Sequence, residues 1–233
     1  MAKKNEATTE ATVITLQPIN VKHGVICIRG MTDIVLNKMN ASNTRQLLAD
    51  DRKAQGVWEA QHKNMWEDII TAIHWRDPLP IKGDNSDGLA TNRECNEEMM
   101  MWLLENNAPC ITAFGLKRSW GQAVTQQEID KYRTKFDAAV NVVSPGGLVP
   151  IKFAEWRIDE RVMMPGGARK GSPITTRLSH FIGWSAEVPI EYTTNVYNET
   201  AIATAVNYAG FSIGIGSGRT SGYGRYSIVD FRG

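Results

Sequence analysis

The sequence lacks the features of disulfide-bonded, metal-binding and secreted proteins. Its three cysteines, at positions 27, 95 and 110, include no Cys-x-x-Cys pair, and such a set is poor material for a disulfide framework or a zinc site. We expect reduced, buried thiols. The four histidines form no His-x-His or His-Glu-x-x-His motif, so the sequence predicts no metal and no cofactor.

Long hydrophobic runs are also missing. No stretch approaches about 18 consecutive apolar residues, so no membrane-spanning helix is predicted. The first residues, MAKKNEATTEAT, carry lysines but no apolar segment after them, which is unlike a secretory signal. The sequence therefore predicts a cytoplasmic protein without a membrane partner, with residues 1–11 as a disordered tail.

Neither sign of charge is in excess. There are 26 Lys and Arg against 25 Asp and Glu, a formal net charge of +1. A protein that binds nucleic acid through its whole surface is therefore not expected, and only a local basic patch could serve. Apolar residues make up 42% of the chain, which is an ordinary globular value and excludes wholesale disorder.

Residue patterning predicts an N-terminal half at 12–147, with strands followed by helices. β-Branched residues favour strands at 13–16, 21–28 and 33–36. Apolar residues spaced by three and four favour helices inserted between about 41 and 140. One of these helices should begin at the capping-box pattern Thr125-Gln-Gln-Glu128. The sequence SPGG at 144–147 then marks a boundary.

The second half, 148–233, has the order strand, strand, helix, strand, strand. The expected elements are strands at 148–164 and 177–193, a helix from Asn198 to Gly210, and strands at 211–215 and 225–231. Trp184 and Phe211 should be core residues that face the helix. Both halves together predict one α+β domain, a ferredoxin-like antiparallel sheet with a helical insertion and a glycine-rich C-terminal hairpin loop.

The strongest functional signal is the loop GIGSGRTSGYGRY, residues 214–226. It contains five glycines, two arginines, two tyrosines and no acidic residue. Consecutive amides in such loops form anion-binding concavities, arginine suits phosphate, and tyrosine offers a stacking face. The loop matches neither the GxxxxGK[ST] pattern nor the Rossmann pattern. The alternative is a hairpin turn in which the glycines serve only the backbone.

A second basic segment comprises Arg157, Arg161, Arg169, Lys170 and Arg177. Arg157 and Arg161 share strand parity, so both should leave the sheet on one side. The alternative is a solvated outer face. No catalytic motif is present, and His180, in a strand beside Phe181, is expected to pack.

Two segments resemble the RAMP superfamily, the repeat-associated proteins of CRISPR systems. A helix, a glycine, the run Phe-Ser-Ile-Gly-Ile-Gly at 211–216 and a loop with Arg and Gly-x-Gly are similar to the family's C-terminal glycine-rich loop. Residues 109–120 loosely resemble its Pro-Gly-Ser-Ser-x-Lys-Gly-x-x-Arg segment. They lack the Gly and Ser after the proline, and Lys117 and Arg118 are adjacent. The resemblance implies an RRM-like fold that binds RNA.

Three other segments resemble uncharacterised bacteriophage proteins: the start at Ile14, the strand from Trp184 to Tyr192, and residues 209–216. That likeness implies no function.

The favoured hypothesis is a phage-encoded, non-catalytic protein that binds RNA or single-stranded nucleic acid and forms a homo-oligomer along the strand. One alternative is a metal-independent endoribonuclease that uses His23, His62 or His74. Another is a phage counter-defence protein that sequesters a host defence partner or a nucleotide signal. The expected nucleic-acid-binding residues are Lys117, Arg118, Arg157, Arg161, Arg169, Lys170, Arg177, Gly214, Gly216, Gly218, Arg219, Gly222, Tyr223, Gly224 and Arg225.

Overall fold

The computed structural model describes residues 19–81, 94–163 and 174–233. The predicted tail at 1–11 and the strand at 13–16 lie outside these residues. Two antiparallel sheets and seven α-helices are present in the described part. The α+β class and the antiparallel sheet that the sequence predicts are therefore confirmed.

The larger sheet has seven strands in the order β10-β1-β9-β6-β4-β3, with β5 also paired to β9. The first and last strands of the described chain, β1 and β10, lie side by side. The strands are β1 (Val21–Gly30), β3 (His74–Trp75), β4 (Pro109–Thr112), β5 (Val140–Val142), β6 (Leu148–Lys152), β9 (Ser185–Thr193) and β10 (Tyr226–Arg232).

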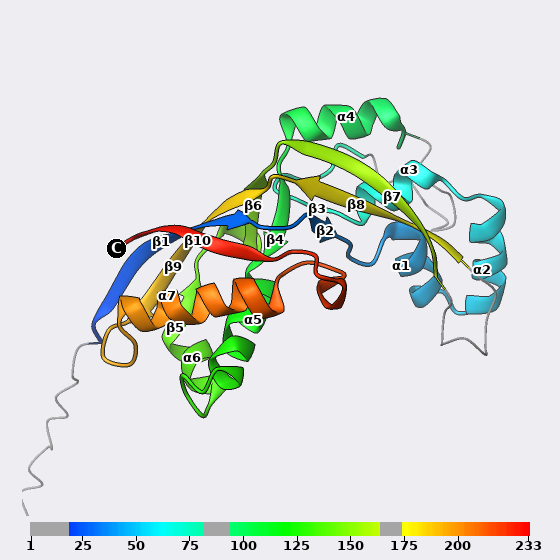
Figure 1. The fold of residues 1–233 in the computed structure, drawn as a ribbon. Helices are drawn as coiled ribbons and strands as arrows, with labels where there is room; N and C mark the ends of the chain where they lie inside the picture. The colour runs from blue at the N-terminus through cyan, green and yellow to red at the C-terminus, as the bar shows by residue number, and fades with distance from the viewer. Residues whose placement is uncertain (1–18, 82–93, 164–173) are drawn as a thin grey trace, which may run out of the picture.

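The smaller sheet has the order β2-β8-β7. Its strands are β2 (Ile34–Leu36), β7 (Glu155–Met163) and β8 (Ile174–Ile182). Figure 1 shows that β6 leads into β7 and β8 into β9, so that two long ribbons connect the sheets. The predicted strands 148–164 and 177–193 thus each divide in two, and they pair along both parts as expected.

The bend between the sheets lies at Ala154 and Gly183. Gly183 has a φ of 62°, which glycine adopts without strain. The Ala154 N–H donates to the Ile182 carbonyl over 2.9 Å, so the two ribbons remain bonded where they turn. A Cβ on Gly183 would lie 3.1 Å from the Ala154 Cβ, which leaves little room for a larger residue.

Helices cover the larger sheet and flank the smaller one. In Figure 1, α5, α6 and α7 lie below the larger sheet, whereas α1 and α2 lie at the far end beside β7 and β8. The helices are α1 (Ala41–Leu48), α2 (Arg52–Gln61), α3 (Met65–Thr71), α4 (Glu97–Asn106), α5 (Ala113–Gln126), α6 (Arg133–Ala139) and α7 (Glu199–Tyr208). None of the described helices is long and apolar enough to cross a membrane.

The predicted helix start at Thr125 is wrong. Thr112 caps the 14-residue helix α5 by accepting from the Gly115 N–H over 3.0 Å, and this helix runs through Thr125. The Thr125 hydroxyl donates to the Gln122 carbonyl within α5 instead of capping a new helix. Glu128 has a φ of 54°, so the chain turns there before α6.

The predicted strand at 211–215 is also wrong. Residues Ala209–Ile213 form a π-helical turn that extends α7, and it ends at Gly214, whose φ is 72°. Gly210 does not end the helix. It allows close packing, because a Cβ there would lie 2.1 Å from the Tyr226 carbonyl oxygen. As a result Phe211 is 59% exposed and is not a core residue.

The hydrophobic core lies between the larger sheet and its helices. Trp184 is fully buried, as predicted, and so is Trp120 of α5. The Trp120 indole N–H donates to the Tyr226 hydroxyl over 2.9 Å, which satisfies both buried polar groups. Of the cysteines, Cys95 and Cys110 are buried free thiols as expected, whereas Cys27 is only partly buried.

Candidate nucleic-acid interface

The glycine-rich loop depends on its glycines. All five, at 214, 216, 218, 222 and 224, have φ between 69° and 88°, a range that L side chains rarely adopt. Gly224 is the most constrained by its surroundings, since a Cβ there would lie 1.8 Å from the Ile215 carbonyl oxygen. The backbone conformation of the loop therefore requires glycine at these five positions.

Hydrogen bonds attach the loop to β2 and to the turn before it. The Ser217 N–H donates to the Val35 carbonyl and the Gly224 N–H to the Asp33 carbonyl, both over 2.8 Å. The Thr32 hydroxyl donates to the Gly222 carbonyl over 2.9 Å. The amides of Ser217 and Gly224 are thus engaged within the protein, and at these positions the expected anion-binding amides are not free. At these two positions, side chains would have to make the contacts with a ligand.

The two loop arginines have different surroundings. The Arg225 guanidinium lies over the Phe211 ring, 5.7 Å from its centroid, which is a cation–π arrangement. Arg219 begins the 3-10 turn Arg219–Ser221 and has no ion-pair partner among the residues that the structure describes. Both charges remain available for a phosphate.

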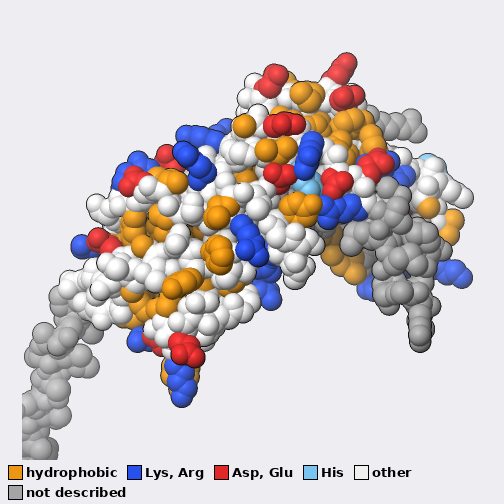
Figure 2. Space-filling model, in the orientation of Figure 1, with side chains coloured by type: hydrophobic (Ala, Val, Ile, Leu, Met, Phe, Trp, Pro, Cys, Tyr) orange, Lys and Arg blue, Asp and Glu red, His pale blue; other side chains and the backbone are white. Residues whose placement is uncertain are grey.

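Tyr223 brings the loop against the second basic segment. The Arg161 guanidinium lies 5.0 Å from the Tyr223 ring centroid and donates to the Tyr223 hydroxyl. Arg161 and Arg157 leave the same face of β7, as their parity predicts. Each is held by a carboxylate: Arg161 Nε lies 2.6 Å from Asp159 Oδ2, and Arg157 Nη2 lies 2.9 Å from Asp33 Oδ2. Figure 2 shows acidic and basic side chains interspersed over this part of the molecule.

His180 lies fully buried beneath this face. Its ring meets the Tyr223 ring edge to face, with centroids 5.0 Å apart. Its nitrogens lie 3.8 Å from Asp33 Oδ2 and 3.5 Å from Asp159 Oδ2, without a hydrogen bond. Burial lowers the pKa of His180, although both carboxylates oppose that shift. The expected packing role is therefore the one observed, with the imidazole neutral.

The remaining candidates lie in other surroundings. Arg177 Nε pairs with Glu160 Oε1 over 2.6 Å. Lys117 Nζ donates to the Asp137 carbonyl over 2.7 Å and to Asn141 Oδ1 over 2.8 Å, so it links α5 to α6 and β5. Arg118 is exposed on α5. Arg169 and Lys170 lie outside the described residues.

Sequence reasoning missed two exposed aromatic residues near the loop. Phe114 on α5 is 71% exposed, and Phe211 is 59% exposed. The π turn that carries Phe211 packs against α5, and the Ser119 hydroxyl of α5 donates to the Gly214 carbonyl over 2.9 Å. The Phe-x-x-x-Arg spacing of Phe114 and Arg118 would have placed both on one helix face. Exposed aromatic rings next to arginine are typical of single-strand binding surfaces.

No protein-family model and no curated protein matches this chain. Solved structures do match. One is a chain in the cryo-EM structure of the type III-B Cmr-beta complex bound to cognate target RNA, with 10% sequence identity and a TM-score of 0.51. That match covers 91% of this chain and 60% of the other, so this chain spans 60% of its relative's length.

Cmr6 from Pyrococcus furiosus also matches, with 12% identity and a TM-score of 0.30, over 91% of this chain and 100% of that one. The fold similarity rests on the Cmr-beta chain, whose TM-score is higher. The chain therefore has a fold similar to that of the Cmr-beta chain.

Proposed function

We propose that this chain binds single-stranded nucleic acid, RNA foremost, along the face formed by the glycine-rich loop and β7. The observation that carries the proposal is the contact between Tyr223 of the loop and Arg161 of β7. It joins two segments that sequence reasoning selected independently. Arg219 and Arg225 would contact phosphates, and the exposed Phe211 and Phe114 would stack on bases.

The comparison adds indirect support. The Cmr-beta structure that shares this fold is bound to cognate target RNA. The proposal for this chain rests also on the arginines and aromatic rings of its own surface. The proposal keeps the finer expectations from the sequence: a ferredoxin-like core, halves at 12–147 and 148–233 of one domain, a phage-encoded protein, and a homo-oligomer along the strand.

The proposed role is binding without cleavage. The candidate catalytic histidines lie on different elements: His23 on β1, His62 after α2 and His74 on β3. His62 stacks on Trp58 with ring centroids 4.4 Å apart, and His23 Nδ1 lies 3.6 Å from Glu191 Oε1. General acid–base catalysis needs its groups within reach of one substrate atom, and this distribution does not favour it.

The test is a titration of labelled single-stranded RNA and DNA at two salt concentrations. Replacing Arg219 and Arg225 by Ala should weaken binding and reduce the salt slope by about 1.4, since each lost contact contributes ~0.7. The matched control replaces Arg52 and Lys53, two exposed cations of α2, by Ala and should leave the slope unchanged.

Equal binding by the parent and the Arg219/Arg225 variant at both salts would show that the loop is only a turn. Shortened RNA products on a denaturing gel, made by the parent protein in EDTA, would contradict the non-catalytic part of the proposal.

A further inference from the structure

We propose that the cleft between α1, α2, α3 and β8 is a nucleotide-binding pocket in which Lys38 contacts a phosphate. The proposal rests on the proposed function in that the ligand has the same chemistry, but the pocket lies outside the loop–β7 face. The nucleotide is either one unit of the bound strand or a free nucleotide.

The cleft has the size of a ligand site. Its volume is about 630 Å³, and residues of α1, α2, α3 and the segment 37–40 line it together with Thr176 and Arg177 of β8. Pockets of roughly 300–1,000 Å³ hold small molecules and cofactors. The lining combines polar side chains with the apolar Met39, Met65 and Ala60, a mixture that suits a base with a charged phosphate.

A second cavity adjoins the glycine-rich loop. It has a volume of about 200 Å³ and is lined by Ile215, Gly216 and Ser217 of the loop and by Thr112 and Gly115 at the start of α5. Asn37 and Lys38 line both cavities. A strand held on the loop would therefore lie near Lys38, which lines both cavities.

Lys38 is the cation of the cleft that lacks a partner. No carboxylate pairs with it among the described residues, and burial lowers its pKa. The other two cations of the cleft are engaged: Lys63 Nζ lies 4.0 Å from Asp68 Oδ2, and Arg177 pairs with Glu160. Lys38 is an exposed residue, so its ammonium can exchange bound water for the oxygen of an anion.

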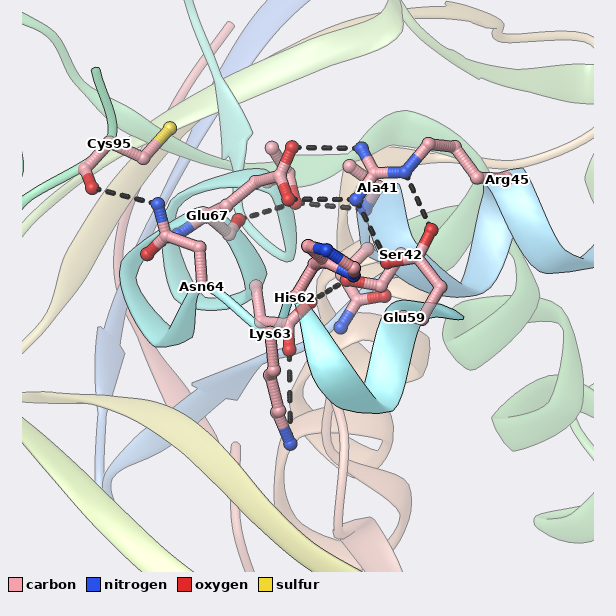
Figure 3. Close-up of polar contacts among 12 residues, drawn as sticks. Ala41, Ser42, Arg45, Glu59, His62, Lys63, Asn64, Glu67 and Cys95 are labelled. Carbon is pink, nitrogen blue, oxygen red and sulfur yellow. Dashed lines mark hydrogen bonds and ion pairs between the residues drawn. The ribbon is translucent and has the colours of Figure 1, made fainter. Parts of the chain in front are cut away.

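Arg45 binds the carboxylates of both Glu59 and Glu67 and so offsets part of the negative charge beside the cleft. Figure 3 shows Arg45 between Glu59 and Glu67, joined to both by hydrogen bonds. Arg45 Nε lies 2.7 Å from Glu59 Oε1, and Nη2 lies 2.8 Å from Glu67 Oε2. Both carboxylates raise the pKa of Arg45. This buried network fixes α1, α2 and α3 relative to one another, so the pocket is formed before a ligand arrives.

Two side-chain amides in the cleft are available to a base. Asn37 donates and accepts no hydrogen bond through its side chain within the described residues, and the same holds for Asn43; only their backbone groups are engaged. Carboxamides recognise the edges of bases by paired donor and acceptor groups. Within the part of the chain that the structure describes, the cleft thus combines one cation without an ion-pair partner with two side-chain amides without hydrogen bonds.

The experiment compares Lys38→Ala, Lys38→Arg and the cleft-filling Ala60→Trp with the control Lys53→Ala on α2. Two probes are titrated, a labelled uridine-rich RNA and the free nucleotides AMP and UMP. Lys38→Ala and Ala60→Trp should weaken binding of at least one probe by about tenfold, the effect of losing one charge-assisted contact. Lys38→Arg should recover most of the affinity, and Lys53→Ala should match the parent.

Each outcome decides the proposal. A loss confined to RNA assigns the pocket to the strand, and a loss confined to AMP or UMP assigns it to a free nucleotide. Parent-like binding of both probes by Lys38→Ala and Ala60→Trp overturns the pocket. If the Arg219/Arg225 variant then still loses RNA, the proposed function stands without it; if that variant also binds like the parent, both proposals fail. Thermal unfolding of Lys38→Arg and Ala60→Trp confirms that the variants are folded.

Discussion

Trp184 occupies space that Gly30 leaves open. A Cβ on Gly30 would lie 2.2 Å from Trp184 Nε1, and the indole N–H donates to the Thr32 carbonyl over 2.8 Å. Trp184→Ala should therefore lower the free energy of unfolding by ~3–5 kcal/mol. Phe211→Ala, at a 59% exposed ring, should cost less than about 1 kcal/mol. Urea unfolding of both variants checks this, and equal losses would contradict the burial of Trp184.

His180 makes stability depend on pH. The unfolded chain takes up a proton on histidine near pH ~6.5, whereas burial lowers the pKa of His180 in the folded protein. Protonation of His180 therefore favours the unfolded state. The free energy of unfolding should be highest above pH ~6.5 and should decrease as the pH falls toward the lower pKa of the folded protein. The charged or titratable groups around the ring are Asp33, Arg157, Asp159, Arg161 and Tyr223.

In the parent protein, the free energy of unfolding measured with urea should decrease between pH 7 and pH 5. His180→Asn should make this decrease smaller, whereas His62→Asn, at an exposed histidine, should leave it unchanged. An identical decline in the parent and in His180→Asn would show that the neutral imidazole is not responsible.

For single residues, the sequence predicts burial or exposure where side chains alternate along a strand. Trp184 was assigned to the core correctly, and Arg157 and Arg161 to one face. Phe211 was assigned wrongly because its alternating neighbours are typical of a strand, whereas the segment continues α7 as a π turn. That turn depends on contact between Gly210 and Tyr226, which local sequence does not reveal.

At the scale of elements, the glycine-rich loop needs glycine for two different reasons, which are close packing at Gly224 and positive φ at Gly222. Gly224→Ala places a Cβ 1.8 Å from a backbone carbonyl, whereas Gly222, with a φ of 88°, has nothing within 4 Å. Gly222→Ala should cost only the strain of a left-handed alanine, about 1 kcal/mol, and Gly224→Ala considerably more. Thermal unfolding with RNA titration checks the order, and a milder effect of Gly224→Ala would contradict the loop geometry.

The elements themselves were predicted unevenly. Strand pairing of 148–164 with 177–193 is correct because both runs are long and β-branched. The bend at Ala154 and Gly183 was missed, since alternation continues on either side of it. The composition of the loop indicates its presence, but its attachment to the turn before β2 joins residues 190 positions apart, Thr32 and Gly222. No sequence spacing reports such a contact.

For the whole molecule, the near-zero net charge limits how salt can affect binding. Among the described residues, the two loop arginines have no ion-pair partner, whereas Arg157 and Arg161 of β7 are paired with carboxylates. At ~0.7 per contact, the slope of log affinity against log salt should lie between about −1.4 and −2.8 for RNA. Lys117→Met should lower stability by removing the link from α5 to Asp137 and Asn141, yet leave this slope unchanged. A much steeper slope would indicate binding through the general surface.

The pairing of β1 with β10 has a consequence for synthesis of the protein. Ile28 lies opposite Ile228, and Gly30 opposite Tyr226, so β1 gains its second neighbouring strand only after residues 226–232 have left the ribosome. Contacts between such distant residues form slowly, and until then β1 presents an unpaired edge to other nascent chains. The nascent chain should therefore need a chaperone during translation, and the loop between α7 and β10 should be the last part of the surface to mature.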